Sequence, residues 1–500
     1  MKKEIRIGIL GLIVSVSIIT QNQAKSNVNI EMMEDHGKEN IIDQEQSASA
    51  CINLSTGKST FLYCTEANII EGKLQVQGGD NMTWEGNAKM EWEINVPENE
   101  EYELFLIANI RNEATGEKLS FKTDEKTYRF ELAETKGPYK GGRNFQRVLL
   151  SSEVGLKKGI QKVALLSEGI SKEGVLIDIR SIELLPVSAK NKIKVETERA
   201  IASRASVGWL KETGYGLMFH WTSQSVQRDG SIKKYEDAVN DFDVAKFAHM
   251  VEETGAGYVI FTIGHAESYC PAPIKSWEKV HPGHTTQRDL IEEIANALNS
   301  KGIKLICYIN GPLGFNLQVK TEPSTEEKQA FISNFKNILS EMGKRYENKI
   351  AGYWFDSWYQ IFERFPQVPF EEFNKAVKTG NKDRIFCLNS WIYPAVTPWQ
   401  DYWAGEVASP IELPENGYMK DGPVPDLPYQ ALLIMEPYWV QQKAEMPEPR
   451  FSSEKLGKYI EDCMENGGVV TVNMGIYQDG TVGEKALEVM REVKIKVKKK

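Results

Sequence analysis

The stretch Gly352-Tyr353-Trp354-Phe355-Asp356-Ser357-Trp358 is a short apolar and aromatic run that stops at a carboxylate. A run of this length bounded by polar residues is typical of a buried strand. An Asp at the tip of such a strand is held by rigid backbone and can still face a cleft. Our hypothesis is that Asp356 attacks the anomeric carbon of a sugar, as the nucleophile of a retaining glycoside hydrolase does. The alternative is a structural Asp that caps the turn after the strand.

Cleavage of a glycosidic bond by this route needs a second carboxyl group, which must be protonated to release the leaving group. In a retaining enzyme the two groups stand about 5 to 5.5 Å apart. Our candidate is Glu406 in Tyr402-Trp403-Ala404-Gly405-Glu406, because apolar neighbours such as Trp403 would raise its pKa and keep it protonated. The rival carboxyl groups are Glu267, Glu412, Glu415 and Glu436.

Other polar and aromatic residues follow the remaining apolar runs of this half of the chain. Tryptophans supply flat apolar surface on which sugar rings can stack, and His and Glu can bind hydroxyl groups. For any single His, a structural role is the alternative. The expected substrate-binding residues are His220, Trp221, His265, Glu267, Tyr308, Trp354 and Trp358.

A repeated pattern of elements must position these residues. From Gly214 onward, short apolar runs alternate with amphipathic stretches. The expected strands are residues 215–220, 258–263, 304–308, 352–356, 384–388, 402–406, 432–435 and 469–473, and the expected helices are 243–254, 288–300, 328–346 and 484–493. Eight apolar runs with helices between several of them predict a parallel, TIM-like (β/α)8 barrel over 214–493. In such a barrel the active site lies at the C-terminal ends of the strands, where the candidate residues fall.

Residues 51–190 have a different rhythm, in which short alternating runs recur between turn signals. The expected strands are residues 73–76, 88–94, 102–108, 118–122, 127–132, 145–150, 161–166 and 175–185. This spacing predicts a β-sandwich. The stretch from Met90 to Leu106 resembles jelly-roll carbohydrate-binding modules that are attached to glycosidases. The alternative is a packing module without a ligand. Residues 191–213 would connect the two domains.

The two ends of the chain lie outside these domains. Residues 1–24 combine Lys2, Lys3 and Arg6 with an apolar run too short to span a membrane comfortably, which predicts a signal peptide and a secreted or periplasmic protein. The alternative is an N-terminal anchor that is never cleaved. Residues 25–50 are a polar, acidic linker, and 494–500 form a basic, frayed tail.

Composition limits the possible partners. The net charge of −10 and a pI near 5.5 argue against nucleic acid, because phosphate binders concentrate Lys and Arg. Six cysteines do not make a disulfide framework. Cys51 and Cys64 are close enough in sequence to bridge, and Cys270, Cys307, Cys387 and Cys463 read as small buried hydrophobes. We expect no structural zinc site, no catalytic metal and no cofactor, and no stable membrane insertion after signal cleavage.

Several segments between 215 and 493 keep the order of motifs in one known family. They are Gly216-Leu217-Met218-Phe219-His220-Trp221, Phe242-Asp243 with Ala256-Gly257-Tyr258, Thr262 to Cys270, Arg288-Asp289-Leu290 with Gly302 to Tyr308, Trp354-Phe355-Asp356, and Gly467 to Gly475 with Asp479-Gly480. At these residues the chain resembles the α-L-fucosidase family, glycoside hydrolase family 29. The resemblance implies Asp356 as nucleophile and His220 and His265 as ligands of sugar hydroxyls. The family's motifs fix the acid/base poorly, so Glu406 rests on its position and neighbours.

The chain also departs from the family pattern. Ala266 stands where the family has the second of two histidines, Gly264 stands where it has a Lys, and Thr222-Ser223 replace Gly-Leu. The expected sandwich precedes the barrel instead of following it. The leading prediction is a retaining, fucosidase-like enzyme that cleaves terminal sugars from oligosaccharides or glycoconjugates. The alternatives are a catalytically inactive barrel that binds carbohydrate, and a glycosidase for another sugar such as galactose or arabinose.

Overall fold

The computed structural model describes residues 51–77, 81–135, 145–170, 175–311, 324–358, 368–389, 397–408, 410, 413, 418–419 and 427–497. The expected signal peptide and the polar linker lie outside these residues. The rival carboxyl groups of Glu412 and Glu415 lie outside them as well.

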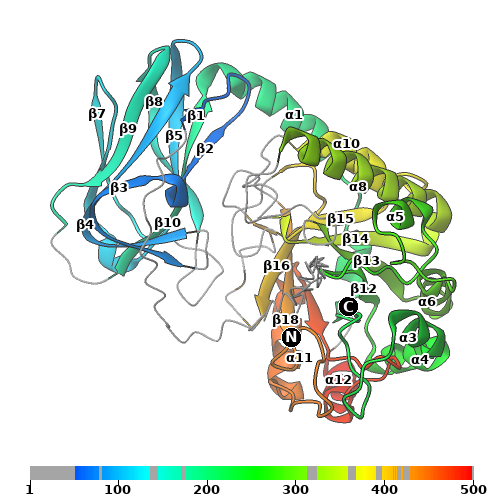
Figure 1. Ribbon diagram of the computed structural model, residues 1–500. Helices are drawn as coiled ribbons and strands as arrows, with labels where there is room; N and C mark the ends of the chain where they lie inside the picture. The colour runs from blue at the N-terminus through cyan, green and yellow to red at the C-terminus, as the bar shows by residue number, and fades with distance from the viewer. Residues whose placement is uncertain are drawn as a thin grey trace, which may run out of the picture. The chain divides into compact units, whose positions relative to one another are not determined.

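The N-terminal half is rich in antiparallel strands (Figure 1). They pair in the order β7-β6-β9-β4-β10-β5-β8, with β1, β2 and β3 attached to β4 or β10. Their bounds are β1 Ile52–Asn53, β2 Thr60–Tyr63, β3 Asn68–Gln77, β4 Asn81–Val96, β5 Glu100–Ile110, β6 Lys118–Lys122, β7 Thr127–Glu131, β8 Gln146–Leu156, β9 Gly159–Ser167 and β10 Val175–Pro186. Every strand expected here is present, whereas the short β1 and β2 were not expected.

Alternation along the strands builds a core for this β region. In β4 the side chains of Met90, Trp92 and Ile94 are fully buried, whereas those of Glu91 and Glu93 between them are only partly buried. This is the period-two burial that a strand with one face on a core requires. Domain boundaries themselves stay a prediction.

The expected bridge between Cys51 and Cys64 is wrong, because both thiols are free. Cys64 is fully buried in the core of the β region, whereas Cys51 is only partly buried. The other four cysteines are buried, as predicted.

Two helices, α1 (Lys190–Ala202) and α2 (Gly208–Glu212), join the two halves of the chain. Trp209 of α2 meets Tyr258 edge to face, with ring centroids 6.3 Å apart, and Lys304 lies over the Trp209 ring. Tyr258 and Lys304 are the first residues of β12 and β13. Helix α2 therefore covers the N-terminal end of these strands.

The C-terminal half contains eight parallel strands within the described residues, which form a nearly closed barrel (Figure 1). They pair in the order β15-β14-β13-β12-β11-β19-β18-β16, so β15 and β16 end the ladder, and β17 (Tyr418–Met419) pairs antiparallel with β18. Their bounds are β11 Tyr215–Phe219, β12 Tyr258–Gly264, β13 Lys304–Asn310, β14 Ile350–Asp356, β15 Ile385–Leu388, β16 Trp403–Ala408, β18 Leu427–Ile434 and β19 Val469–Asn473. All eight correspond to expected strands.

Helices cover the outside of these strands. They are α3 Tyr235–Asp241, α4 Val244–Thr254, α5 Lys275–Val280, α6 Leu290–Asn299, α8 Thr325–Tyr346, α10 Phe370–Val377, α11 Ser453–Glu465 and α12 Glu484–Lys496. In α6 the predicted apolar stripe is buried, and the Asp289 carboxylate caps the first turn by accepting from the Glu292 amide. The expected frayed tail from Lys494 is corrected, because α12 continues to Lys496.

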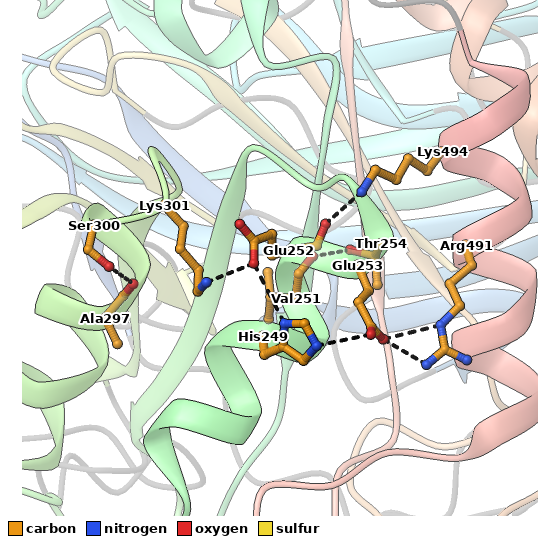
Figure 2. A network of polar contacts seen from close by, with 10 residues as sticks. All are labelled: His249, Val251, Glu252, Glu253, Thr254, Ala297, Ser300, Lys301, Arg491 and Lys494. Atoms are coloured by element: carbon orange, nitrogen blue, oxygen red, sulfur yellow. Dashed lines mark hydrogen bonds and ion pairs between the residues drawn. The ribbon is translucent and has the colours of Figure 1, made fainter.

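The first and last parts of the barrel close on each other. Strand β11 pairs with β19, and α4 packs against α12. Figure 2 shows the polar contacts at this seam. The Arg491 guanidinium lies 2.7 Å from Glu253, and the Lys494 ammonium donates to the Glu252 carbonyl at 3.0 Å. Lys301, beyond α6, pairs with the Glu252 carboxylate at 2.7 Å. Because such pairs are exposed, they orient the helices more than they stabilise them.

No helix in the described part of the chain is long and apolar enough to cross a membrane.

Candidate active site

Two carboxyl groups meet at the C-terminal ends of β14 and β16. The amide nitrogen of Asn389, directly after β15, donates to Asp356 Oδ1 at 2.8 Å and to Glu406 Oε2 at 2.5 Å. Because these oxygens lie 2.8 and 2.5 Å from one nitrogen, their separation cannot exceed the sum of the two distances. That upper limit falls within the spacing of about 5 to 5.5 Å between the carboxyl groups of retaining glycosidases. Inverting enzymes hold the groups about 6.5 to 9.5 Å apart.

Three donors converge on the Asp356 carboxylate. Tyr308 donates its hydroxyl hydrogen to Oδ2, while the Ser357 amide, at 2.7 Å, and Asn389 donate to Oδ1. Ser357 adopts φ 62°, a left-handed conformation that costs free energy in a residue other than glycine. That conformation accompanies the contact of its amide with the carboxylate of the preceding residue. An ionised carboxylate, which only accepts hydrogen bonds, suits this set of donors.

Glu406 has the opposite electrostatic environment. Burial and the nearby charge of Asp356 raise the pKa of Glu406 to about 8, against a smaller lowering by the Asn389 hydrogen bond. Trp403, which we expected to raise this pKa, instead stacks on Tyr429 with ring centroids 5.5 Å apart, in the hydrophobic core. At neutral pH Glu406 therefore keeps its proton, as a general acid requires.

His220, at the end of β11, is a buried neutral imidazole. Burial, with a further contribution from His265, lowers the pKa of His220 to about 3. Its Nδ1 lies 2.7 Å from Asn473 Oδ1, and the Asn473 amide nitrogen donates to the Trp439 carbonyl. Because the Asn473 oxygen must accept, Nδ1 carries the hydrogen and Nε2 is left as an acceptor.

Aromatic rings connect His220 to the carboxylates. The Tyr308 ring meets the His220 ring edge to face at 4.9 Å and is stacked on Trp354 at 5.4 Å. Trp354 is 1% exposed, and its indole donates to Gln430 at 3.3 Å. Trp354 thus lies beneath Tyr308 inside the barrel and supports the ring that contacts Asp356.

His265 and Glu267 follow β12 beside this group. The His265 ring is stacked with Tyr308 at 6.0 Å, and its Nδ1 lies 3.7 Å from Glu267 Oε2. Burial by itself raises the pKa of Glu267, but His265 and the amide of Gln224 outweigh it and lower the pKa on balance. Glu267 is therefore suited to accept hydrogen bonds and not to donate a catalytic proton.

Two of the predicted substrate-binding residues lie in the core instead. Trp221 is 1% exposed and packs on Phe261 and Phe242, while Trp358 is fully buried against Phe335. Both rings point between the strands and the helices, so neither offers a face to a sugar. The prediction that they bind substrate is corrected, and Trp354, buried beneath Tyr308, supports the site without exposing a ring.

The rival Glu436 follows β18 and is 1% exposed. Its Oε2 accepts from the Gly475 amide at 2.8 Å, and burial raises the pKa of Glu436 to about 7. Its protonation would suit an acid, but its hydrogen bond goes to the backbone after β19. Glu406 is the carboxyl group that shares a donor with Asp356.

Three residues at this site were not among the predicted site residues. Asn389 and Asn473 stand at strand ends, which was the available signal, but an Asn there is also a common cap. Trp439 is partly exposed in the loop after β18, with its ring 5.3 Å from His220. It lies outside the strand ends, so the barrel pattern did not indicate it.

Comparisons with known proteins identify a family and similar solved structures. A family model described as alpha-L-fucosidase matches residues 231–496. Similar solved structures include an α-L-fucosidase of Bacteroides thetaiotaomicron trapped as a covalent intermediate with 2-fluoro-fucosyl fluoride, which is 18% identical over 57% of this chain and 73% of that chain, with a TM-score of 0.45. AlfC of Lactobacillus casei in complex with α-L-fucose is 18% identical over 58% of this chain and 97% of that chain, with a TM-score of 0.40. No match was found among curated proteins.

The family model covers more than half of the chain, from the segment after β11 to the end of α12. The β-rich N-terminal region precedes it. The chain therefore belongs to the alpha-L-fucosidase family and is a glycoside hydrolase.

Proposed function

We propose that this protein is a retaining, α-L-fucosidase-like enzyme that removes terminal sugars from glycans by double displacement. One observation carries the proposal: a single amide group donates to both Asp356 and Glu406, which brings Asp356 to retaining distance from a carboxyl group that keeps its proton at neutral pH.

In the first step Asp356 Oδ2 attacks the anomeric carbon while the glycosidic C–O bond breaks. Glu406 gives its proton to the leaving oxygen, so the products are a free alcohol and a glycosyl ester of Asp356. Oδ1, which accepts from the Ser357 amide and Asn389, becomes the carbonyl oxygen of this ester. Those two donors then stabilise the ester in place.

In the second step the ionised Glu406 takes a proton from water, and the resulting hydroxide oxygen attacks the same carbon. The ester bond breaks, Asp356 leaves as a carboxylate, and Glu406 regains its proton. Two inversions give a sugar of unchanged anomeric configuration.

Substrate hydroxyls would meet acceptors on the other side of the site. His220 Nε2 accepts one hydroxyl hydrogen, because Nδ1 donates to Asn473. Glu267 accepts from another, and the partly exposed ring of Trp439 lies where it can pack on an apolar sugar face.

The test is hydrolysis of an aryl α-L-fucoside, with the anomer of the first product read by NMR. Asp356→Ala should lower kcat by at least about 10⁴-fold. Glu436→Gln is the matched control, since Glu436 is a buried carboxyl with a raised pKa that bonds Gly475 rather than Asp356, and it should keep most activity. Inversion of configuration would overturn the retaining mechanism. Turnover of an aryl galactoside or arabinoside without the fucoside would overturn the sugar assignment.

Three wider expectations belong to the same proposal. The strands would form a complete (β/α)8 barrel, supported by the hydrogen bond of Asn389 after β15 to Glu406 of β16, the two ends of the ladder. The β-rich region would be a carbohydrate-binding sandwich, which glycan binding by the full chain with Asp356→Ala would test. Export would follow from the basic and apolar N-terminus, and cell fractionation would test it.

A further inference from the structure

Asn389 is held more rigidly than its place after a strand requires. It is fully buried, its own amide donates to the Phe355 carbonyl at 2.7 Å, and its carbonyl accepts from the Trp358 amide at 3.1 Å. Both bonds tie it to the segment that carries Asp356. The side chain therefore starts from a backbone that moves with the nucleophile.

The chemistry of the amide settles which way the side chain faces. Carboxylate oxygens accept hydrogen bonds, so the NH₂ group and not the oxygen must face Asp356 and Glu406. The two hydrogens of this group go to two different carboxyl groups, at 2.8 and 2.5 Å. A residue with one donor, or none, could not reach both.

We propose that Asn389 is the positioning residue that holds the carboxyl groups of Asp356 and Glu406 at a fixed separation through both steps of the reaction. The inference rests on the proposed function, since it takes the roles of these two groups from there. Asn389 touches neither the sugar nor Asp356 Oδ2, the oxygen that attacks it; it donates to Oδ1 of Asp356 and to Oε2 of Glu406. It acts by keeping Glu406 directed at the leaving oxygen while Asp356 is bonded to the sugar.

Two substitutions test this. Asn389→Leu keeps the volume but removes both donors, and Asn389→Asp keeps the shape but removes the amide donors. Asn374→Leu is the matched control, because Asn374 is also buried, on α10, and donates to Ser203 outside the site. We expect Asn389→Leu to lower kcat by about 10²-fold, as small displacements of catalytic groups do, with KM within about twofold. Asn389→Asp should lose more, because it adds a third acid to the pair.

The pH profile separates positioning from mere stability. Two titratable groups lie near Glu406, Asp356 at the end of β14 and Tyr308 in β13. Its other neighbours are uncharged: Asn389 after β15 and Leu432, its pairing partner in β18. Asn389 is the donor that favours the ionised form of Glu406. Its loss should move the alkaline limb of kcat/KM to higher pH, whereas Asn374→Leu should leave that limb in place.

Each outcome decides the question. A lower kcat with a displaced alkaline limb supports the inference. Unchanged activity in Asn389→Leu overturns it. The inference also fails if Asn389→Leu loses activity only in proportion to its loss of thermal stability, as Asn374→Leu does, while the alkaline limb stays in place. If Asn389→Leu does not fold, the same readings on Asn389→Asp decide. Activity that survives Asp356→Ala would instead overturn the proposed function. That measurement needs no Asn389 variant, so the two failures can be told apart.

Discussion

In the proposed mechanism, Glu406 can act as an acid because of its surroundings and not because of its type. An ordinary glutamate would be ionised at neutral pH, but burial and Asp356 raise its pKa to about 8. A raised pKa means that the proton is retained below that value and lost as the pH rises through it. The first step needs the proton, so alkaline conditions should inactivate the enzyme.

We therefore predict that kcat/KM falls about tenfold per pH unit above about pH 8. In Glu406→Gln this alkaline limb should vanish, with activity on poor leaving groups reduced about 10²- to 10⁴-fold. Activated aryl leaving groups, which need no acid, should be affected least. An alkaline limb that persists in Glu406→Gln would assign the proton to another group, with Glu436 as the first candidate.

For single residues, the sequence predicted their places at the ends of strands better than the contacts of their side chains. Asp356 and Glu406 were predictable, because the ends of parallel strands meet at one rim. Trp221 and Trp358 were predicted wrongly, because each follows a strand end, where the turn decides whether a ring faces the cleft or the core. Asn389 follows the fifth strand, but nothing in the sequence shows that its amide reaches two carboxyl groups.

Among the elements, β12 ends in a glycine for a packing reason. A Cβ on Gly264 would lie 2.3 Å from the ring of Trp277, which is fully buried and donates to the Ser268 carbonyl. The family pattern has a lysine at this position. Here the Trp277 ring fills the space that a side chain at position 264 would need. The next residue, His265, belongs to the site.

Gly264→Ala should lower the free energy of unfolding by about 1 to 3 kcal/mol, since the Trp277 ring must move. Adding Trp277→Phe should recover part of this loss in a double-mutant cycle followed by urea unfolding. Gly155→Ala is the control, because a Cβ there meets open space. Additive effects of the two substitutions would show that the side chains at positions 264 and 277 do not contact each other.

A buried arginine joins three elements. Arg384, before β15, is fully buried. Its guanidinium donates to the carbonyls of Val377 and Thr379 at 2.7 Å, at the C-terminal end of α10, and of Glu347 at 2.6 Å, directly after α8. Helix C-termini carry partial negative charge, which offsets the cation without a carboxylate.

Arg384→Met should cost on the order of 3 to 5 kcal/mol, because several buried carbonyls lose a donor at about 1 to 3 kcal/mol each. Arg345→Met, at a partly exposed pair with Asp289, should cost no more than about 1 kcal/mol. Chemical denaturation of both variants provides the measurement. Equal losses of unfolding free energy in the two variants would contradict a stabilising role for the hydrogen bonds from Arg384 to the carbonyls.

Length helped to make helices predictable but did not decide it, because the 13-residue α11 was not expected. The 22-residue α8 and the stripe of α6 were expected, whereas α3, α5 and α10, of six to eight residues, were not. Two turns of helix give too few repeats to distinguish period 3.6 from chance. The two-residue β1 is held by its parallel pairing with β4, a long-range contact that its own residues do not encode.

Across the whole molecule, the β region and the barrel have largely separate hydrophobic cores. We predict two calorimetric transitions. Leu106→Ala in the β region and Ile306→Ala in the barrel interior should each cost about 2 to 5 kcal/mol and lower only their own transition. Loss of activity should follow the barrel's transition. A single transition lowered by both variants would show one cooperative unit.

The seam between β11 and β19 has a consequence for biosynthesis. His220 and Asn473 are 253 positions apart, yet their side chains share a hydrogen bond. The neutral imidazole thus depends on a residue that the ribosome makes 253 positions later. Until β19 and α12 have been synthesised, β11 and α4 have unpaired edges and uncovered apolar faces, which invite aggregation. The nascent barrel should therefore expose these surfaces until β19 and α12 have been made.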